Sequence, residues 1–339
     1  MTEGLCPFFK DAFVLKPPKM SSLTIKMIML VIATVCGVYI CSVCLKQISN
    51  QTKSSIEVIG RPGIICETNN LNYPYLHYPQ PETFSRAECA GNPVRFFVII
   101  TMQRSGSGWF ETLLNSHVNV SSNGEIFSVM DRRDNVSSII RTLDKVYNLD
   151  WFNSASKNEC SAAVGLKWML NQGLMDYPEE IVEYFNRKGV SAVFLFRRNL
   201  LRRLISVLAN SFDRHAKILN GTHKSHVHSL EEAETLSKYK PLINSTSLLS
   251  SLKETEFTMA QALTYFNSTR HITLYYEDLI KNRTKLADVQ DFLGIPHMNL
   301  TSRQVKIHKG HLREHIKNWI DVNKTLNGTA YEKFLQLDY

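Results

Sequence analysis

Residues 95–110 carry the sequence RFFVIITMQRSGSGWF, and this stretch decides the fold. Within 95–100, the residues after Arg95 form a continuous apolar run, which is typical of a β-strand buried on both faces of a sheet. A turn of Ser and Gly follows at 103–108, and helical spacing begins at Trp109. Gly106 and Gly108 permit positive φ and a close approach of the backbone. Successive N–H groups can then point into one concavity at the positive end of the helix, so the pattern predicts an anion-binding loop.

The side chains of this loop supply further groups for an anion. Ser105 and Ser107 add hydroxyl donors, and Arg104 adds a fixed positive charge. The loop lacks the lysine and the hydroxyl residue that end an ATP-hydrolysing P-loop, because Trp109 and Phe110 stand there. The pattern therefore disfavours ATP hydrolysis and leaves two interpretations, an anion cradle or an ordinary tight turn.

The rest of the chain repeats the alternation of strands and helices. Continuous apolar runs predict strands at 162–168, 190–196 and 271–276, and helical spacing predicts helices at 178–188, 199–210, 247–266 and 284–293. This alternation predicts an α/β fold of the P-loop type, a three-layer sandwich with a central parallel sheet. Residues 213–246 are polar and lack periodicity, so we expect a lid or a substrate loop there.

A second candidate anion site follows the predicted strand at 190–196. Arg198 stands at the end of this strand, where ligands bind in open α/β sheets. Ser206 lies eight residues further on, in the predicted helix. Arginine offers bidentate phosphate recognition and serine a hydroxyl donor, so the pair predicts a phosphate site. A solvated, basic helix start is the alternative.

The composition is that of a globular protein with a basic surface. The chain has 339 residues, 44% of them hydrophobic and 21% charged, which excludes a disordered chain and a multi-span membrane protein. The formal net charge of +8 suits an anionic ligand, an anionic polymer or a membrane surface, and it does not choose among them.

One segment near the N-terminus has the composition of a membrane span. Residues 27–45 carry no charge, and a helix of that length extends over roughly 29 Å, just enough to cross the hydrocarbon core. Lysines are more frequent before the segment than after it, which predicts a cytosolic N-terminus. We expect a cytosolic tail at 1–26, a signal-anchor helix at 27–45, a stem at 46–93 and a luminal domain at 94–339. A buried core helix is the alternative for residues 27–45.

Ten N-x-[ST] sequons support this topology, because all of them follow the predicted span. The chain has 24 Asn, and Ser and Thr make up about 15% of it, so chance would give about four. The motif is an acceptor only in a secretory compartment, and we expect a single-pass type II glycoprotein of the Golgi membrane. The sequons stand at Asn50, Asn119, Asn135, Asn220, Asn244, Asn267, Asn282, Asn299, Asn323 and Asn327.

Three cysteines lie on the predicted luminal side, which suggests one disulfide and one cysteine left over. We expect the pair Cys66–Cys89 from its proximity in sequence, with Cys160 remaining. The cysteines of the predicted span are candidates for S-acylation, and packing as small apolar side chains is the alternative.

At these sites the chain resembles the sulfotransferases that use 3′-phosphoadenosine 5′-phosphosulfate (PAPS). Their 5′-phosphosulfate loop reads like RSGST or KSGTTW after the first strand, and residues 103–109 match it. Their 3′-phosphate site has Arg and Ser eight residues apart, as Arg198 and Ser206 are here. YEDL at 276–279 and DFLGIP at 291–296 are similar to a further stretch of the superfamily. The whole sequence resembles plant membrane proteins similar to rhizobial Nod-factor sulfotransferases.

The resemblance implies a P-loop fold without nucleotide hydrolysis, PAPS as cosubstrate and a set of donor-binding residues. Lys309 and Gly310 follow His308 in a segment similar to the family's R-K-G loop, with His in place of Arg. The matches together cover about residues 95–320. In the phosphosulfate loop, the implied donor-binding residues are Arg104, Ser105, Gly106, Ser107, Gly108 and Trp109, with Arg104 also in a catalytic role.

Sulfuryl transfer to a hydroxyl also needs a general base at the carboxyl edge of the sheet. Glu125 is the leading candidate, because it lies 21 residues after Arg104, where the chain should return to the cleft. Carbohydrate sulfotransferases often place a glutamate base in this stretch; a capping or surface glutamate is the alternative. Lys167, at the end of a predicted strand, would orient the acceptor, and His117 is a further candidate base.

Three rival functions share some of these features. A luminal glycosyltransferase would have the same anchor, but the chain contains no D-x-D motif. A non-catalytic carbohydrate-binding protein would not need two phosphate sites, and a kinase would need the missing lysine.

The histidines at 215–228 are too unevenly spaced for zinc, so no metal is expected. The expected partner is a hydroxylated acceptor, above all a carbohydrate, and not a nucleic acid.

Overall fold

The computed structural model describes residues 27, 29–40, 42 and 74–336. The chain divides into two units, Met1–Thr68 and Asn69–Tyr339. The described residues of the first unit are all helical. Within the described ranges, no helix combines the length and the apolar character needed to cross a membrane. Residue 28, residue 41 and residues 43–45 of the expected span lie outside these ranges, as do Asn50 and Cys66.

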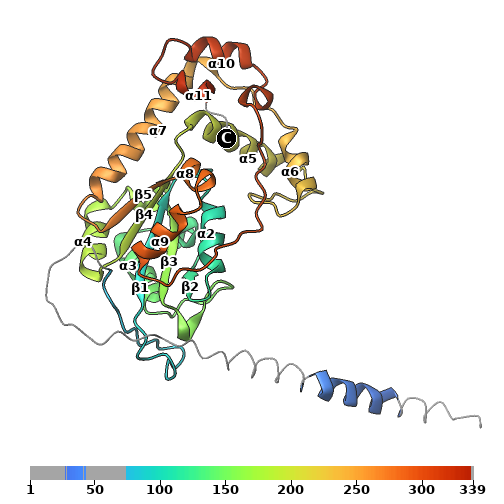
Figure 1. Cartoon of the computed structure of the whole chain (residues 1–339), viewed down its shortest axis with the longest axis vertical. Helices are drawn as coiled ribbons and strands as arrows, with labels where there is room; N and C mark the ends of the chain where they lie inside the picture. Colours follow the sequence, from blue (N-terminus) through green and yellow to red (C-terminus); the bar gives the residue numbers. More distant parts are fainter. Residues whose placement is uncertain (1–26, 28, 41, 43–73, 337–339) are drawn as a thin grey trace, which may run out of the picture. The chain divides into compact units, whose positions relative to one another are not determined.

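Five parallel strands form the sheet of the second unit, in the order β2-β3-β1-β4-β5 (Figure 1). The central strand is β1, which pairs with β3 on one side and with β4 on the other. Its apolar run fits this place, because a central strand between two helical layers is buried on both faces. The strands are β1 Arg95–Thr101, β2 Val120–Ser122, β3 Ala163–Met169, β4 Ser191–Phe196 and β5 His271–Tyr275.

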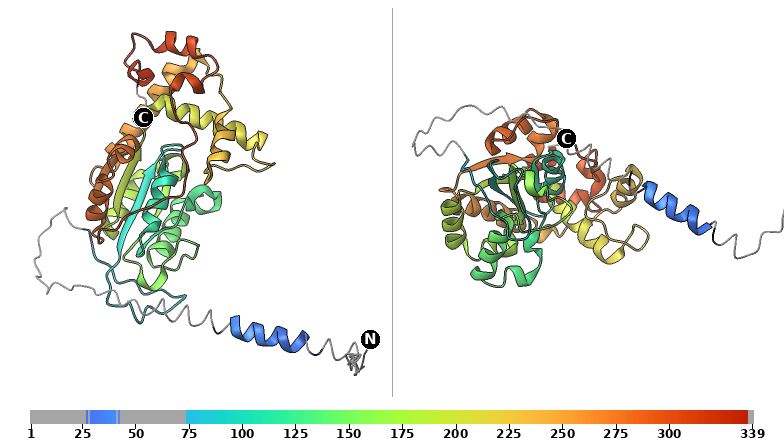
Figure 2. Two further views of the ribbon diagram at one scale, coloured as in Figure 1. Left: turned by 45° about the vertical axis from the view of Figure 1, so that its right-hand side comes forward. Right: turned by 90° about the horizontal axis from the view of Figure 1, so that it is seen from below.

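Helices cover both faces of this sheet (Figure 2). Successive side chains of β1 point to opposite faces. Val98 and Ile100 join a buried cluster with α3, α4 and α7, whereas Phe97 and Ile99 join one with α2 and α9. The expected α/β fold with a central parallel sheet is thus confirmed. The helices are α2 Ser107–Ser116, α3 Val136–Tyr147, α4 Pro178–Lys188, α7 Ser245–Tyr265 and α9 Lys285–Leu293.

A third apolar cluster joins α5 (Leu200–Ala216) to α7, α10 (Trp319–Leu326) and α11 (Lys333–Gln336), at the top of Figure 1. Leu201 and Ile205 of α5 are buried in it. This packing fixes the helix that starts directly after β4, and therefore the residues that α5 presents to the carboxyl edge of the sheet.

Residues 213–246, which we expected to form a lid or a substrate loop, contain helical stretches. Helix α5 continues to Ala216, and α6 occupies Leu230–Ser237. The Ser229 side chain caps α6 by accepting a hydrogen bond from the Glu232 N–H, and Ala233 and Leu236 bury its apolar side. This helix is too short for its period to stand out among the polar residues around it.

The cysteine pairing expected from the sequence is also wrong. Cys89 forms a disulfide with Cys160, at a Cα–Cα distance of 5.6 Å. Arg86 explains how two segments far apart in sequence meet here. Its Nε donates to the Glu159 carbonyl at 3.1 Å, and its Nη2 donates to the Asn92 carbonyl at 3.2 Å. This buried arginine holds the turn that carries Cys89 against the residues that precede β3.

Candidate functional site

The loop between β1 and α2 has two residues in the left-handed region. Arg104 has a φ of 64° and Gly106 a φ of 84°, and α2 begins at Ser107. A Cβ atom on Gly106 would come within 2.2 Å of the Tyr276 ring, so this position requires glycine for its conformation and for its contact. Positive φ was also expected at Gly108. There the backbone is ordinary, and Arg104 adopts the left-handed conformation instead.

The start of α2 offers polar groups that suit an anion. Within the part of the chain that the structure describes, no side chain caps this helix. Ser105 Oγ is buried and meets no hydrogen-bond partner there. A buried hydroxyl left without a partner costs free energy, which a bound oxyanion would offset. The loop residues therefore fit a phosphate or sulfate group.

A cavity of about 600 Å³ opens at this loop. Residues that follow the sheet's strands line it: Arg104 follows β1, Arg197 follows β4 and Tyr276 follows β5. Glu125 and Asn171 come from the ends of β2 and β3. The cavity thus lies at the carboxyl edge of the parallel sheet, where open α/β proteins bind their ligands.

Four basic side chains form what we call the cation cluster: Arg104, Arg197 and Lys306 line the cavity, and Arg203 interacts with the charge of Arg197 without lining it. Burial and the charge of Arg197 lower the pKa of Arg104 to about 10, and they do the same for Arg203. Burial, Arg202 and Arg197 lower the pKa of Lys306 to about 8. Each cation makes the charge of its neighbours less favourable, and a bound anion would reverse this effect.

Arg104 connects the loop to two other elements. Its Nε donates to Ser206 Oγ of α5 at 2.9 Å, and its Nη1 donates to the Ser225 carbonyl at 2.6 Å. Arg197 Nη1 in turn donates to the Arg104 carbonyl at 3.3 Å. The phosphate loop and the end of β4 are therefore one connected site, although about ninety residues separate them in the sequence.

A buried ion network fixes Glu125 in the cavity wall. Lys167 Nζ lies 3.4 Å from Glu125 Oε1 and 2.8 Å from Glu111 Oε2. Gln172 Nε2 donates to Glu125 Oε2 at 3.2 Å. Burial alone would lower the pKa of Lys167, but the two carboxylates raise it above its ordinary value, so Lys167 stays charged. One cation faces two carboxylates, and of these Glu125 lines the cavity.

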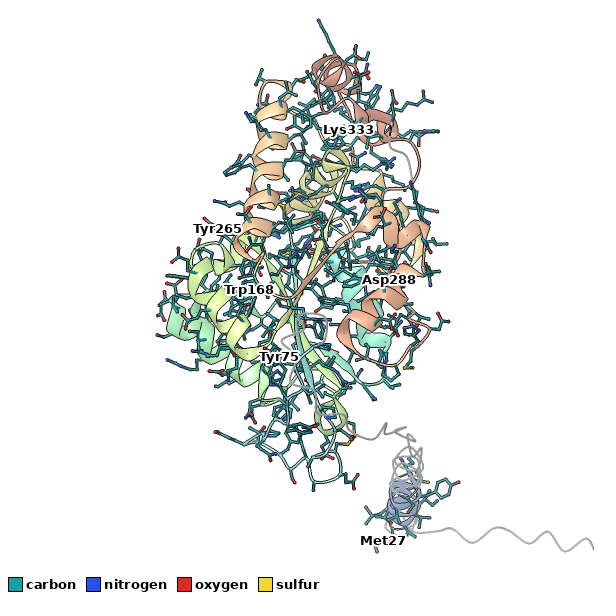
Figure 3. The ribbon with its side chains drawn as sticks, turned by 60° about the vertical axis from the view of Figure 1, so that its left-hand side comes forward. Met27, Tyr75, Trp168, Tyr265, Asp288 and Lys333 are labelled. Carbon is teal, nitrogen blue, oxygen red and sulfur yellow. A yellow bond between two sulfur atoms is a disulfide. The ribbon has the colours of Figure 1, made fainter. Side chains whose placement is uncertain are left out.

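Aromatic packing supports the same wall. The Trp168 side chain, labelled in Figure 3, is fully buried and stacks on Phe127 with ring centroids 4.0 Å apart. Its Nε1–H donates to the Gln172 carbonyl at 2.8 Å. Phe127 stands two residues after Glu125, and Gln172 donates a hydrogen bond to the Glu125 carboxylate. By contacting Phe127 and Gln172, Trp168 therefore helps to hold Glu125 in place.

An edge-to-face aromatic pair lines another part of the cavity. The rings of Trp109 and Tyr276 have centroids 5.7 Å apart and planes 84° apart. Arg197 lies over the Tyr276 ring, with its guanidinium carbon 5.3 Å from the centroid. Two aromatic faces beside a cluster of cations suit a flat heterocycle that carries phosphate.

The structure brings together most of the residues expected at the donor site and the base. Ser105 is buried in the loop behind the cavity. Lys167 is buried behind Glu125 and does not line the cavity, so it contacts the glutamate instead of an acceptor. The expected residues that do line the cavity are Arg104, Gly106, Ser107, Gly108, Trp109, Glu125 and Ser206.

Arg198, Lys309 and Gly310 do not line the cavity. The exposed Arg198 guanidinium pairs with Asp278 and lies over the Tyr275 ring, with its carbon 4.2 Å from the centroid. Lys309 and Gly310 are exposed, and the Gly310 carbonyl accepts a hydrogen bond from Arg202 Nη2 at 2.8 Å.

The cavity residues that the sequence did not single out stand next to those that it did. Arg197 adjoins Arg198, and Lys306 precedes Lys309 by three positions. The alternation of side-chain directions along a strand could have pointed to Arg197 in the sequence. Consecutive side chains at the end of β4 point to opposite sides, so only one of the two arginines can face the cavity.

The histidines at 215–228 do not come together. Among the residues that the structure describes, no group of three or more His, Cys, Asp or Glu side chains is arranged to hold a metal ion. His223 binds Asp213 through Nδ1 at 2.6 Å, and His226 lines the cavity. The candidate base His117 is buried away from the cavity, with its Nε2 3.0 Å from the Pro296 carbonyl.

Comparison with known proteins finds related sequences. Nodulation protein H of Rhizobium meliloti is 24% identical over 251 residues, which cover 72% of this chain and 96% of that protein. Nodulation protein H of Rhizobium tropici is 24% identical over 246 residues, 71% of this chain and 93% of that protein. The solved sulfotransferase domain from the curacin biosynthetic pathway aligns over 72% of this chain and 92% of its own, with 16% identity and a TM-score of 0.33.

The match to the family described as the sulfotransferase domain extends over residues 95–328. These residues include all five strands, the phosphate loop, the cation cluster and Glu125. The match covers well over half of the chain. The protein therefore belongs to the family of PAPS-dependent sulfotransferases and is a sulfotransferase enzyme.

Proposed function

We propose that this enzyme transfers the sulfuryl group of PAPS to a hydroxyl of a glycan-type acceptor in the Golgi lumen. The observation that supports it most is that one cavity is lined by residues of the loop at 104–108, by Arg197 and Lys306 of the cation cluster, and by Glu125. Such a cavity offers charge for a polyanionic donor and a carboxylate for the proton of a hydroxyl.

The residues present fit the donor part by part. The loop N–H groups, Ser105 and Arg104 would hold the phosphosulfate. Arg197, with Ser206 and Lys306, would hold the second phosphate, because all three line the cavity beside Arg104. The Trp109–Tyr276 pair would receive the adenine. When bound, the donor supplies an activated sulfuryl group on a phosphate leaving group.

The chain's own residues then have two tasks in the transfer. Arg104 and the N-terminus of α2 stabilise negative charge on the leaving phosphate. Glu125 accepts the proton of the acceptor hydroxyl as the new oxygen–sulfur bond forms and the bond from sulfur to the phosphate oxygen breaks. Lys167 and Gln172 keep the glutamate in place for this step.

Polar residues in the cavity lining support the proposal of a carbohydrate acceptor. Asn171, Asn210 and Ser211 line the cavity with amide and hydroxyl groups, which pair well with sugar hydroxyls. Gln103 also lines the cavity and donates from Nε2 to Asn171 Oδ1 at 2.6 Å, so the amides of Gln103 and Asn171 stand side by side. The resemblance to Nod-factor sulfotransferases favours the same class of acceptor.

The acceptor class is tested by incubating the full chain with radiolabelled PAPS and a panel of oligosaccharides, polysaccharides, glycolipids and peptides. We expect label on at least one carbohydrate, with Glu125→Gln protein as the negative control. Transfer to a peptide alone, with no label on any carbohydrate, would contradict the proposed acceptor class.

Donor affinity should depend on pH through Lys306. Its pKa is about 8, and the donor's phosphate favours the protonated form. Affinity should therefore be fully present below pH 8 and decrease as pH rises through it, by about tenfold between pH 7 and pH 9. Calorimetric titration with adenosine 3′,5′-bisphosphate at both pH values measures this change.

The matched control is Lys306→Arg, which keeps the positive charge but does not titrate in this range. This variant should bind the bisphosphate equally well at pH 7 and pH 9. Equal affinities of the wild-type protein at the two pH values would show that Lys306 does not hold the donor.

The luminal location rests on the charge asymmetry around residues 27–45 and on the sequons. Of the nine sequon asparagines in the described part of the chain, eight are exposed and Asn119 is half-buried, so their positions are compatible with glycans.

Glycosidase treatment of the protein made in cells should increase its gel mobility, because it removes the mass of several glycans. The protein synthesised without membranes is the control, and unchanged mobility of the cellular protein would refute this location.

A further inference from the structure

His226 holds a place in the cavity that the mechanism above does not use. Its imidazole lies directly over Gly108, the second residue of α2. A Cβ atom at position 108 would come within 2.3 Å of both Cε1 and Nε2 of this ring. The phosphosulfate loops RSGST and KSGTTW carry threonine at the position of Gly108. Here the absence of a side chain leaves room for the histidine.

The segment that carries His226 is fixed on both sides of it. The Ser225 carbonyl accepts the hydrogen bond from Arg104. The Val227 carbonyl accepts one from the Val305 N–H at 2.9 Å, and the Val227 side chain is buried. The backbone that carries the ring is therefore held at the loop before any ligand arrives.

Charged groups lie near the ring. Among the residues that the structure describes, none forms a hydrogen bond with it. Desolvation, with the charges of Arg104, Lys167 and His228, lowers the pKa of His226, so the imidazole is neutral near pH 7. A neutral imidazole carries one N–H donor. The ring also lines the same cavity as Glu125. It thus stands at the loop that holds the phosphosulfate, with a donor to offer.

We propose that His226 donates a hydrogen bond to the sulfuryl group of the donor and positions it for transfer. This inference rests on the proposed function, because it requires PAPS in the cavity. His226 neither gains nor loses a proton in the reaction, since Glu125 takes the proton of the acceptor. The role also accounts for Gly108, because any larger residue would displace the ring.

The sulfuryl group is the part by which PAPS differs from adenosine 3′,5′-bisphosphate, so the two ligands separate this role from general support of the site. Calorimetric titration of the full chain with each ligand is the measurement. His226→Ala should bind PAPS about 10- to 100-fold more weakly, the cost of one hydrogen bond to a charged group, and should bind the bisphosphate within twofold of wild type. The exposed neighbour His228 provides the control, and His228→Ala should leave both affinities unchanged.

Two further variants distinguish a hydrogen bond from a structural contact. His226→Gln keeps an N–H donor and should recover part of the affinity for PAPS. Gly108→Ala should reproduce the loss specific to PAPS, because the ring must leave. Its combination with His226→Ala should add no further loss. The helical backbone at position 108 accepts alanine without strain.

Each outcome decides one question. A His226→Ala protein that keeps the wild-type ratio of the two affinities overturns the proposal, whether both affinities are normal or both are equally reduced. A wild-type protein that binds neither ligand overturns the proposed function itself.

Discussion

Replacing Glu125 by Gln should lower kcat by about 10²–10⁴, the usual contribution of a general base. Glutamine keeps the size of the side chain and can still contact Lys167 and Gln172, which lie 3.4 and 3.2 Å from the two carboxylate oxygens. It cannot take the proton of the acceptor. Because the base acts in the transition state, the affinity for adenosine 3′,5′-bisphosphate should stay within about twofold of wild type.

Initial rates with radiolabelled PAPS and calorimetric titration measure the two quantities separately. Asp131→Asn is the matched control, because Asp131 is an exposed carboxylate near in sequence and does not line the cavity. Normal turnover of the Glu125→Gln protein would contradict the assignment of the base. Loss of bisphosphate binding together with turnover would show that Glu125 supports the loop instead.

The second large effect is expected for Arg197→Ala. Arg197 is buried at the cavity, and removing one partner of a desolvated arginine–phosphate pair costs roughly 2–5 kcal/mol, or about 30- to 5,000-fold in Kd. The folded protein should tolerate the change. Arg197 lowers the pKa of Arg104 and of Arg203, so its removal relieves repulsion among the cations that remain.

Arg198→Ala is the control for this variant, since Arg198 pairs with Asp278 outside the cavity. Calorimetry should show strongly weakened bisphosphate binding for Arg197→Ala and nearly normal binding for Arg198→Ala. Thermal unfolding of both proteins excludes misfolding as the cause. If Arg198→Ala bound the bisphosphate more weakly than Arg197→Ala, Arg198 would be the residue that contacts the phosphate.

Much of the fold follows from local pattern. The apolar run at 95–100 is buried on both faces and becomes β1, and the helix expected at 178–188 is α4 with the same bounds. The short elements β2 and α6 were not predicted. They have three and eight residues, and the hydrophobic pattern of so short a segment cannot be distinguished from that of a loop.

The site was predictable where it depends on the backbone and not where it depends on tertiary contacts. Gly106 shows the first case, since its positive φ follows from the turn itself. Cys89 shows the second, because its partner Cys160 is brought to it by folding over a sequence separation of 71 residues. His226 is similar, since only the packing of Val227 and the hydrogen bond from Arg104 place its ring over Gly108.

The cavity at the carboxyl edge of the sheet should bind a 3′-phosphorylated adenosine donor. Calorimetric titration of the full chain with adenosine 3′,5′-bisphosphate, ADP and a sugar nucleotide tests it most directly. We predict that the bisphosphate binds at least about tenfold more tightly than ADP, which lacks the 3′-phosphate, and that the sugar nucleotide does not compete. Equal binding of ADP, or tighter binding of the sugar nucleotide, would show that the cavity is not a site for this donor.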